Sequence, residues 1–150
     1  MKQFFLAFLV LAGFGASAQT ASPVSWSFSS KKLSENVYEV YLTASIQPGW
    51  HLYAQAQPAD AIAQPTTFIF TRNPLLKYDG KVKEIGKLEK FRDAKLDVSA
   101  NQYSGKVAFV QKVKVVGKAK TAVTGKLEFQ TCDDEKCLPP KTVNFSVALK

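Results

Sequence analysis

The segment Tyr38-Glu39-Val40-Tyr41-Leu42-Thr43-Ala44-Ser45-Ile46 decides the fold class, because its side chains alternate with a period of two. Its even-numbered residues are apolar, whereas polar side chains and Tyr41 stand between them. Successive side chains of a strand point to opposite faces, so this pattern predicts a strand with one buried and one solvated face. Gln47-Pro48-Gly49 is predicted to be a turn, since proline presets φ and glycine tolerates positive φ.

Short alternating runs on both sides of this segment predict further strands. Upstream, Val24, Trp26 and Phe28 alternate with serines. Downstream, the predicted strands are residues 50–53, 67–70, 107–115, 127–132 and 143–149. The turn signals around them are Asn73-Pro74, Asp79-Gly80, Ser104-Gly105, Val116-Gly117 and Thr124-Gly125. Several short strands with regular turns indicate an all-β domain, either a β-sandwich or a barrel.

Two stretches lack this alternation. Residues 54–65 are rich in Ala, Gln and Pro and are predicted to form a loop. Residues 87–102 mix charges with Phe91, Leu96 and Val98 and are also interpreted as a long loop. Long loops in compact domains are often functional, so both are candidate recognition segments.

The N-terminus has the pattern of a secretory signal peptide. Lys2 precedes an apolar run at residues 4–14, which is too short to span a bilayer as a helix, and Ala16-Ser17-Ala18 is a small-x-small cleavage site. We therefore expect a signal peptide at residues 1–18, cleaved after Ala18, and one mature domain at residues 19–150 in the periplasm or secreted. No later stretch is apolar enough for a transmembrane segment in the mature chain.

The chain is basic, with a formal net charge of +8, but its lysines are dispersed. Many alternate with apolar residues, as in Lys112-Val113-Lys114-Val115, which is typical of a solvated strand face. An exported protein rarely meets nucleic acid, so no nucleic-acid partner is expected. Weak attraction to anionic membrane surfaces or acidic partners is compatible with the charge.

Cys132 and Cys137 are the only cysteines, and four residues separate them. In an oxidising compartment such a pair can form a disulfide. A ring of about six residues stabilises a fold by roughly 2 kcal/mol, against about 3 kcal/mol for a fifteen-residue loop. A chain of this length also buries a sufficient core without a staple. The pair therefore favours redox chemistry, with a structural staple as the alternative.

Strand parity predicts where the pair lies. Leu127 and Phe129 should face the core, which places Cys132 on the opposite, outward face and both cysteines beside the tip of a hairpin. A disulfide there needs Cα atoms about 4.4–6.8 Å apart. The acidic residues 133–135 lie between the cysteines. They predict thiol pKa values at or above the free value of about 8.5, so exchange would depend on a partner that supplies the thiolate.

Other cysteine chemistry has little support in the sequence. His51 is the only histidine, whereas a structural zinc ion needs about four ligands, so no metal site is predicted. A cysteine protease would need His51 as its base, and nothing else in the sequence supports that interpretation. No cofactor is expected.

Two motifs resemble the N-terminal periplasmic domain of the thiol:disulfide interchange reductase DsbD. One is Phe129-Gln130-Thr131-Cys132, a short acidic loop and Cys137-Leu138-Pro139-Pro140 before a closing strand; the other is Ile46-Gln47-Pro48-Gly49-Trp50-His51-Leu52-Tyr53. The resemblance extends from about Val24 to Leu149. It implies an immunoglobulin-like β-sandwich that takes electrons from the thioredoxin-like domain of a membrane electron carrier. The domain would pass them to oxidised periplasmic thiol proteins.

The resemblance also implies roles for individual residues. Cys132 and Cys137 match the redox pair, and Cys137 would form the mixed disulfide with partners. Tyr53 matches an aromatic residue beside the pair, and His51 stands where a second tyrosine is expected; both would shield the sulfurs and steer protons, or else lie on a wet sandwich face. The family's cap loop carries an acid and a phenylalanine, for which Asp93 and Phe91 are the nearest candidates, although Phe91 also fits a core position.

Two further expectations concern the protein as a whole. Reductases of this type continue into a membrane domain and a thioredoxin-like domain, so a chain that stops at Lys150 would need a separate protein for the membrane step. The rival interpretation is a non-catalytic immunoglobulin-like binding or envelope module with a structural disulfide. Its recognition loop would be residues 54–65 or 87–102.

Overall fold

The computed structural model describes residues 22–150, in which eleven strands and no helix are present. The described part accordingly holds no helix that is long and apolar enough to cross a membrane. The predicted signal peptide, residues 1–18, lies outside the described residues. The strands are β1 (Val24–Ser34), β2 (Val37–Ile46), β3 (His51–Tyr53), β4 (Thr67–Phe70), β5 (Leu76–Ile85), β6 (Glu89–Asp93), β7 (Val98–Tyr103), β8 (Lys106–Val115), β9 (Thr121–Phe129), β10 (Thr131–Cys132) and β11 (Lys141–Leu149).

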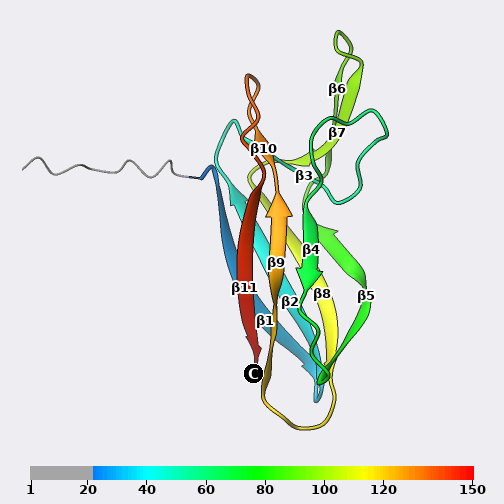
Figure 1. Ribbon diagram of the computed structural model, residues 1–150, viewed down its shortest axis with the longest axis vertical. Helices are drawn as coiled ribbons and strands as arrows, with labels where there is room; N and C mark the ends of the chain where they lie inside the picture. Colours follow the sequence, from blue (N-terminus) through cyan, green and yellow to red (C-terminus); the bar gives the residue numbers. More distant parts are fainter. Residues whose placement is uncertain (1–21) are drawn as a thin grey trace, which may run out of the picture.

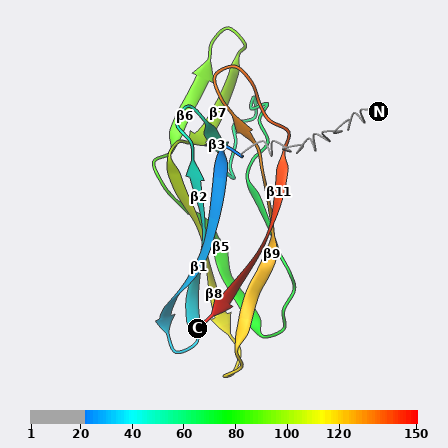
Figure 2. The same ribbon diagram turned by 90° about the vertical axis from the view of Figure 1, so that its left-hand side faces the viewer.

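Two antiparallel sheets form the body of the molecule. The four-stranded sheet has the order β1-β2-β8-β5, and the three-stranded sheet has the order β11-β9-β4. The two lie face to face, as the edge-on view shows (Figure 2). A third sheet, of order β10-β3-β7-β6, lies at one end of the sandwich, and we call it the end sheet (Figure 1). The all-β, immunoglobulin-like β-sandwich predicted from the sequence is confirmed.

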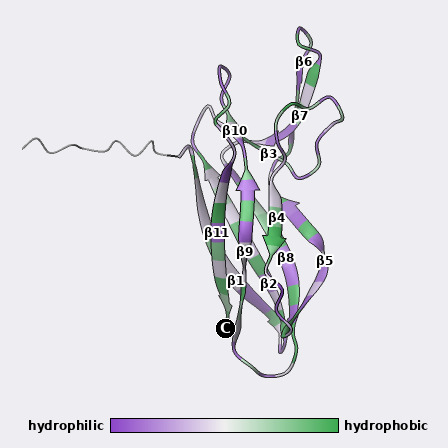
Figure 3. Cartoon of the chain, viewed as in Figure 1, coloured by the Kyte–Doolittle hydropathy of each residue, from purple (hydrophilic) through white to green (hydrophobic). Residues whose placement is uncertain are grey.

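The core lies between the two sandwich sheets and is built from alternate residues. Burial alternates along β2, where Val40 and Leu42 are fully buried. Hydrophobic and hydrophilic bands alternate in the same way along β9 (Figure 3). Phe109 of β8 and Leu127 of β9 meet these side chains from the other strands and are also fully buried. The period-two pattern thus supplies one continuous apolar core, which is the main source of stability.

Gly125 of β9 permits a close approach of neighbouring strands. A Cβ at this position would collide with the carbonyl oxygen of Ile69 in β4 and would lie 2.7 Å from Cζ of Phe145 in β11. Since β9 pairs with both strands, neither neighbour can retreat without disturbing a ladder. The sequence suggested a turn at Thr124-Gly125, and that expectation is wrong, because the glycine lies inside a strand.

Gly125→Ala is therefore expected to destabilise the domain by about 1–3 kcal/mol, the usual cost of overpacking. The measurement is the midpoint of urea unfolding, compared with that of Lys126→Ala at the exposed neighbouring position. The control should change the free energy of unfolding by less than about 0.5 kcal/mol. Equal midpoints for the two variants would contradict the packing described here.

Strand β5 departs from the sequence expectation. Asp79-Gly80 suggested a turn, but both residues lie within β5, where the register against β8 shifts between Asp79 and Lys83. Gly80 has φ of 70°, a left-handed conformation that glycine adopts readily. A bulge inserts such residues into a strand without ending it. The same dipeptide therefore fits a bulge as well as a turn.

The segment 87–102 is also different from its prediction. It forms a β-hairpin of β6 and β7, whereas residues 54–65 contain no strand, as expected. Asp93 fixes the hairpin turn, because its Oδ1 accepts hydrogen bonds from the backbone N–H groups of Lys95 at 2.8 Å and Leu96 at 3.1 Å. The hairpin projects from the end of the sandwich (Figure 1), so much of both its faces is solvated and the alternating pattern is lost.

Candidate functional site

The two cysteines close a short hairpin at the end of the sandwich. Cys132 and Cys137 form an antiparallel bridge, their Cα atoms lie 4.0 Å apart, and a disulfide joins their sulfurs. The backbone N–H of Asp133 donates to the carbonyl oxygen of Lys136 at 2.9 Å, and that of Leu138 donates to the carbonyl oxygen of Thr131 at 2.9 Å. The hairpin predicted from the sequence is thus present, with a Cα separation slightly below the expected range.

Asp133 fixes the turn between the cysteines. Its Oδ1 accepts hydrogen bonds from the backbone N–H groups of Glu135 at 2.9 Å and Lys136 at 2.7 Å. These two bonds stabilise the charged carboxylate and hold the pKa of Asp133 below its usual 3.8. The turn therefore keeps its negative charge and its shape at neutral pH.

The two sulfur-bearing residues differ in burial. Cys132 is 3% exposed, whereas Cys137 is exposed. Cys132 lies outside the main core that contains Leu127 and Phe129, but the expectation that it faces solvent is wrong. Cys132 packs in a small second cluster with Tyr53 and Ala100 of the end sheet, and Ala63 of the loop 54–65 packs against this cluster. Attack from solvent is therefore favoured at Cys137.

Strand β3 lies directly beside Cys132. His51 is the residue opposite Cys132, and Leu52, opposite Thr131, points into the main core with no exposure. Tyr53 shares the disulfide face and is 7% exposed, and burial raises the pKa of its phenol. Of the two β3 side chains on this face, Tyr53 is therefore buried and His51 is partly exposed.

All of the predicted site residues line one groove of about 400 Å³. Its lining includes the two cysteines with the turn between them, and His51 and Tyr53 of β3. Phe91 and Asp93 reach it from β6, so the hairpin occupies the place where the sequence suggested a cap. Phe91 is 48% exposed, which makes its interpretation as a core residue wrong. The other lining residues include Ile62, Ala63, Leu96, Val98 and Ala100.

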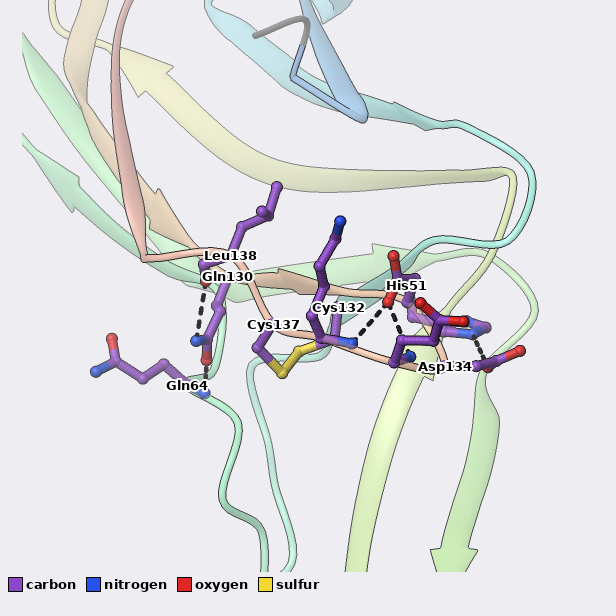
Figure 4. Close-up of a disulfide and its surroundings, with 10 residues drawn as sticks. His51, Gln64, Gln130, Cys132, Asp134, Cys137 and Leu138 are labelled. Carbon is purple, nitrogen blue, oxygen red and sulfur yellow. Dashed lines mark hydrogen bonds and ion pairs between the residues drawn. A yellow bond between two sulfur atoms is a disulfide. The ribbon is translucent and has the colours of Figure 1, made fainter.

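Gln130 lies in the motif before Cys132, and its side chain has two hydrogen-bond partners. Its Nε2 donates to the carbonyl oxygen of Leu138 at 3.1 Å, and its Oε1 accepts from the backbone N–H of Gln64 at 2.8 Å (Figure 4). The side chain thus joins the segment after Cys137 to the loop 54–65. No periodic pattern marks either partner, so the sequence could not predict this link.

The family model for the thiol:disulfide interchange protein DsbD, N-terminal, matches residues 18–149. No curated protein sequence matches the chain. A similar solved structure is the DsbD N-terminal domain of Neisseria meningitidis in the reduced form, with 19% identity and a TM-score of 0.51, covering 77% of this chain and 78% of that one.

A second similar structure is the N-terminal periplasmic domain of ScsB from Proteus mirabilis. It has 17% identity and a TM-score of 0.49, and the match covers 84% of this chain and 44% of that one. The likeness to the Neisseria structure supports the fold, and the family model matches nearly all of the described residues. The chain therefore belongs to the family of DsbD N-terminal domains, which are periplasmic thiol–disulfide exchange domains.

Proposed function

We propose that the Cys132–Cys137 disulfide of this domain is opened by the thioredoxin-like domain of a membrane electron carrier. The resulting dithiol then reduces oxidised periplasmic thiol proteins. The observation that carries this proposal is the unequal burial of the pair, with Cys137 exposed and Cys132 at 3% exposure. A staple that only stabilises the fold has no need for one accessible end.

The unequal burial supports a particular order for the exchange. A partner thiolate attacks Sγ of Cys137, the Cys132–Cys137 bond breaks, and its electron pair stays on Cys132 as a thiolate. The partner's second thiol then attacks the mixed disulfide, so that the partner becomes oxidised and both cysteines become thiols. In the second half, the Cys137 thiolate attacks a substrate disulfide, and Cys132 resolves the mixed disulfide and restores the Cys132–Cys137 bond.

The walls of the groove support selectivity for a partner. Phe91 and Tyr53 contribute aromatic surface beside the pair, and the acidic turn after Cys132 disfavours thiolates in the reduced protein. A domain of this kind reacts slowly by itself and quickly with a partner that supplies a low-pKa thiolate. We propose that Tyr53, Phe91 and Asp93 shield the sulfur of Cys132, whereas Cys137 stays accessible to the partner.

Localisation and the N-terminal boundary are part of the same proposal. A signal peptide at residues 1–18 would direct the chain to the periplasm, and cleavage after Ala18 would leave residues 19–150 as the mature domain. N-terminal sequencing of the exported protein tests this boundary, with Gln19 as the expected first residue.

The reduction potential separates exchange from stapling. The protein is equilibrated in dithiothreitol or glutathione redox buffers, and the fraction of Cys132 and Cys137 open to alkylation is measured by mass spectrometry. An exchanging pair should have a potential above about −300 mV, whereas a structural bond lies below that value. A value below it would favour the non-catalytic binding or envelope module. The double variant Cys132→Ala/Cys137→Ala shows whether folding needs the bond.

A further inference from the structure

His51, the residue opposite Cys132, belongs to a series of three hydrogen-bonded side chains. Nδ1 of His51 lies 3.0 Å from Oγ of Ser104, and that hydroxyl donates to Oε2 of Glu89 at 3.0 Å. His51 begins β3, Ser104 directly follows β7, and Glu89 begins β6. The series therefore connects the β6–β7 hairpin to the strand that flanks Cys132.

The series assigns the protons on the imidazole. A hydroxyl has one proton, and a carboxylate only accepts, so the Ser104 proton is directed to Glu89. The Ser104 oxygen must then accept from Nδ1–H of His51. This arrangement leaves Nε2 as the nitrogen that gains or loses a proton, and it keeps the ring orientation fixed.

Nε2 is directed toward the cysteine turn. It lies 3.8 Å from Oδ1 of Asp134, and Figure 4 shows the two side chains together on the Cys132 side of the disulfide. Cys132 and His51 are directly opposed in an antiparallel pair, which places Cβ atoms about 5 Å apart. The Asp134 side chain is 94% exposed and that of His51 is 23% exposed, so the solvated carboxylate does little to neutralise the ring.

The charged surroundings of this pair are predominantly acidic. Asp134 faces His51 from the turn after β10, and Glu89 faces it from β6 through Ser104. The other charged groups lining the groove are Asp93, Asp133, Glu135 and Lys136. Burial and negative neighbours both disfavour a thiolate on Cys132, which is the group released when the disulfide opens.

We infer that protonated His51 stabilises the thiolate released on Cys132, with Ser104 and Glu89 as positioning residues. This role rests on the proposed function. When a partner thiolate attacks Sγ of Cys137, the electron pair of the broken bond moves to Sγ of Cys132. The imidazolium then offsets the new negative charge. The same Cys132 thiolate is the attacking group when a mixed disulfide on Cys137 is resolved and the Cys132–Cys137 bond forms again.

The expected consequence is a rate of opening that falls as pH rises. An opposite charge within a few ångströms lowers a pKa by about 1–3 units, and a leaving thiol with a lower pKa leaves faster. The rate constant, expressed per attacking thiolate, should be about threefold to tenfold higher near pH 5.5 than near pH 8.5. His51 is the only histidine, the pKa of Asp133 lies below this range and that of Tyr53 above it.

The test measures opening of the disulfide by dithiothreitol across this pH range, with each rate divided by the thiolate concentration. His51→Gln should lose the pH dependence and retain the slow rate of the high-pH limit. His51→Lys carries a positive charge throughout and should keep the fast rate at both ends. Ser104→Ala should show a smaller pH effect than the unmodified chain. Lys126→Gln, at an exposed position of β9 in the three-stranded sheet, is the control and should keep the full effect.

The possible results separate this role from the exchange function itself. Suppose that the His51→Gln disulfide still opens and re-forms, and that its rate has the same pH dependence as that of the unmodified chain. This result overturns the role of His51 and leaves the exchange function in place. A loss of rate in His51→Lys equal to that in His51→Gln also overturns it, because packing rather than charge would then matter. A disulfide that no variant opens at any pH overturns the proposed function, and with it this role.

Discussion

Replacement of Cys132 by alanine is expected to convert the domain into a trap for its partners. The variant keeps Cys137, which is exposed and can attack a partner disulfide, but it lacks the buried sulfur that would resolve the product. A mixed disulfide through Cys137 should therefore accumulate until the limiting protein is consumed. Cys137→Ala should form almost none, because Cys132 is 3% exposed.

The measurement is a non-reducing gel after each variant is mixed with an oxidised thioredoxin-fold protein, with the linkage located by mass spectrometry. Tryptophan fluorescence reports that both variants are folded, because Trp26 and Trp50 both pack against the core. Equal trapping by the two variants would show that both sulfurs are accessible and would refute the assigned order of attack.

Phe109→Ala is expected to be the most damaging single change in the core. Phe109 is fully buried, and its ring centroid lies 5.0 Å from that of Phe68 and 6.4 Å from that of Tyr103. With Trp26 at 5.8 Å, these contacts join the four-stranded sheet to the three-stranded sheet and to the end sheet. Truncation of such a ring costs about 3–5 kcal/mol, a large part of the stability of one domain.

Phe91→Ala is the matched control for this change. It removes the same ring from the exposed β6–β7 hairpin, where Phe91 is 48% exposed. Urea unfolding should show a loss of less than about 1 kcal/mol for Phe91→Ala and several times that for Phe109→Ala. Equal losses would mean that the ring at the groove is a structural anchor, contrary to its position in the structure.

The fold could be predicted where one face of a strand is buried and the other is solvated. This condition holds along Val37–Ile46, Lys106–Val115 and Lys141–Leu149, and these strands were all expected from their alternation. It fails in the β6–β7 hairpin, which projects from the sandwich. The pattern is also hard to recognise in β5, because Gly80 lies in a bulge there. Bulges and turns both favour glycine, so the sequence does not distinguish them.

The candidate site was partly predictable for similar reasons. The cysteine spacing marked the redox pair, and strand parity placed His51 and Tyr53 on one face. Parity gives the face of a residue but not what covers that face, so the burial of Cys132 against Tyr53, Ala100 and Ala63 was missed. Ser104 and Gln64 bind site residues from irregular segments, whose contacts depend on tertiary structure and leave no periodic mark in the sequence.

The most direct measurement is incubation of the oxidised domain with a reduced thioredoxin-fold donor, followed by alkylation and mass spectrometry of the two cysteines. We predict that Cys132 and Cys137 both become alkylated while the domain stays folded, and that an oxidised thiol protein then restores the bond. An intact disulfide on a native domain after prolonged incubation would contradict the account and leave the pair as a structural staple.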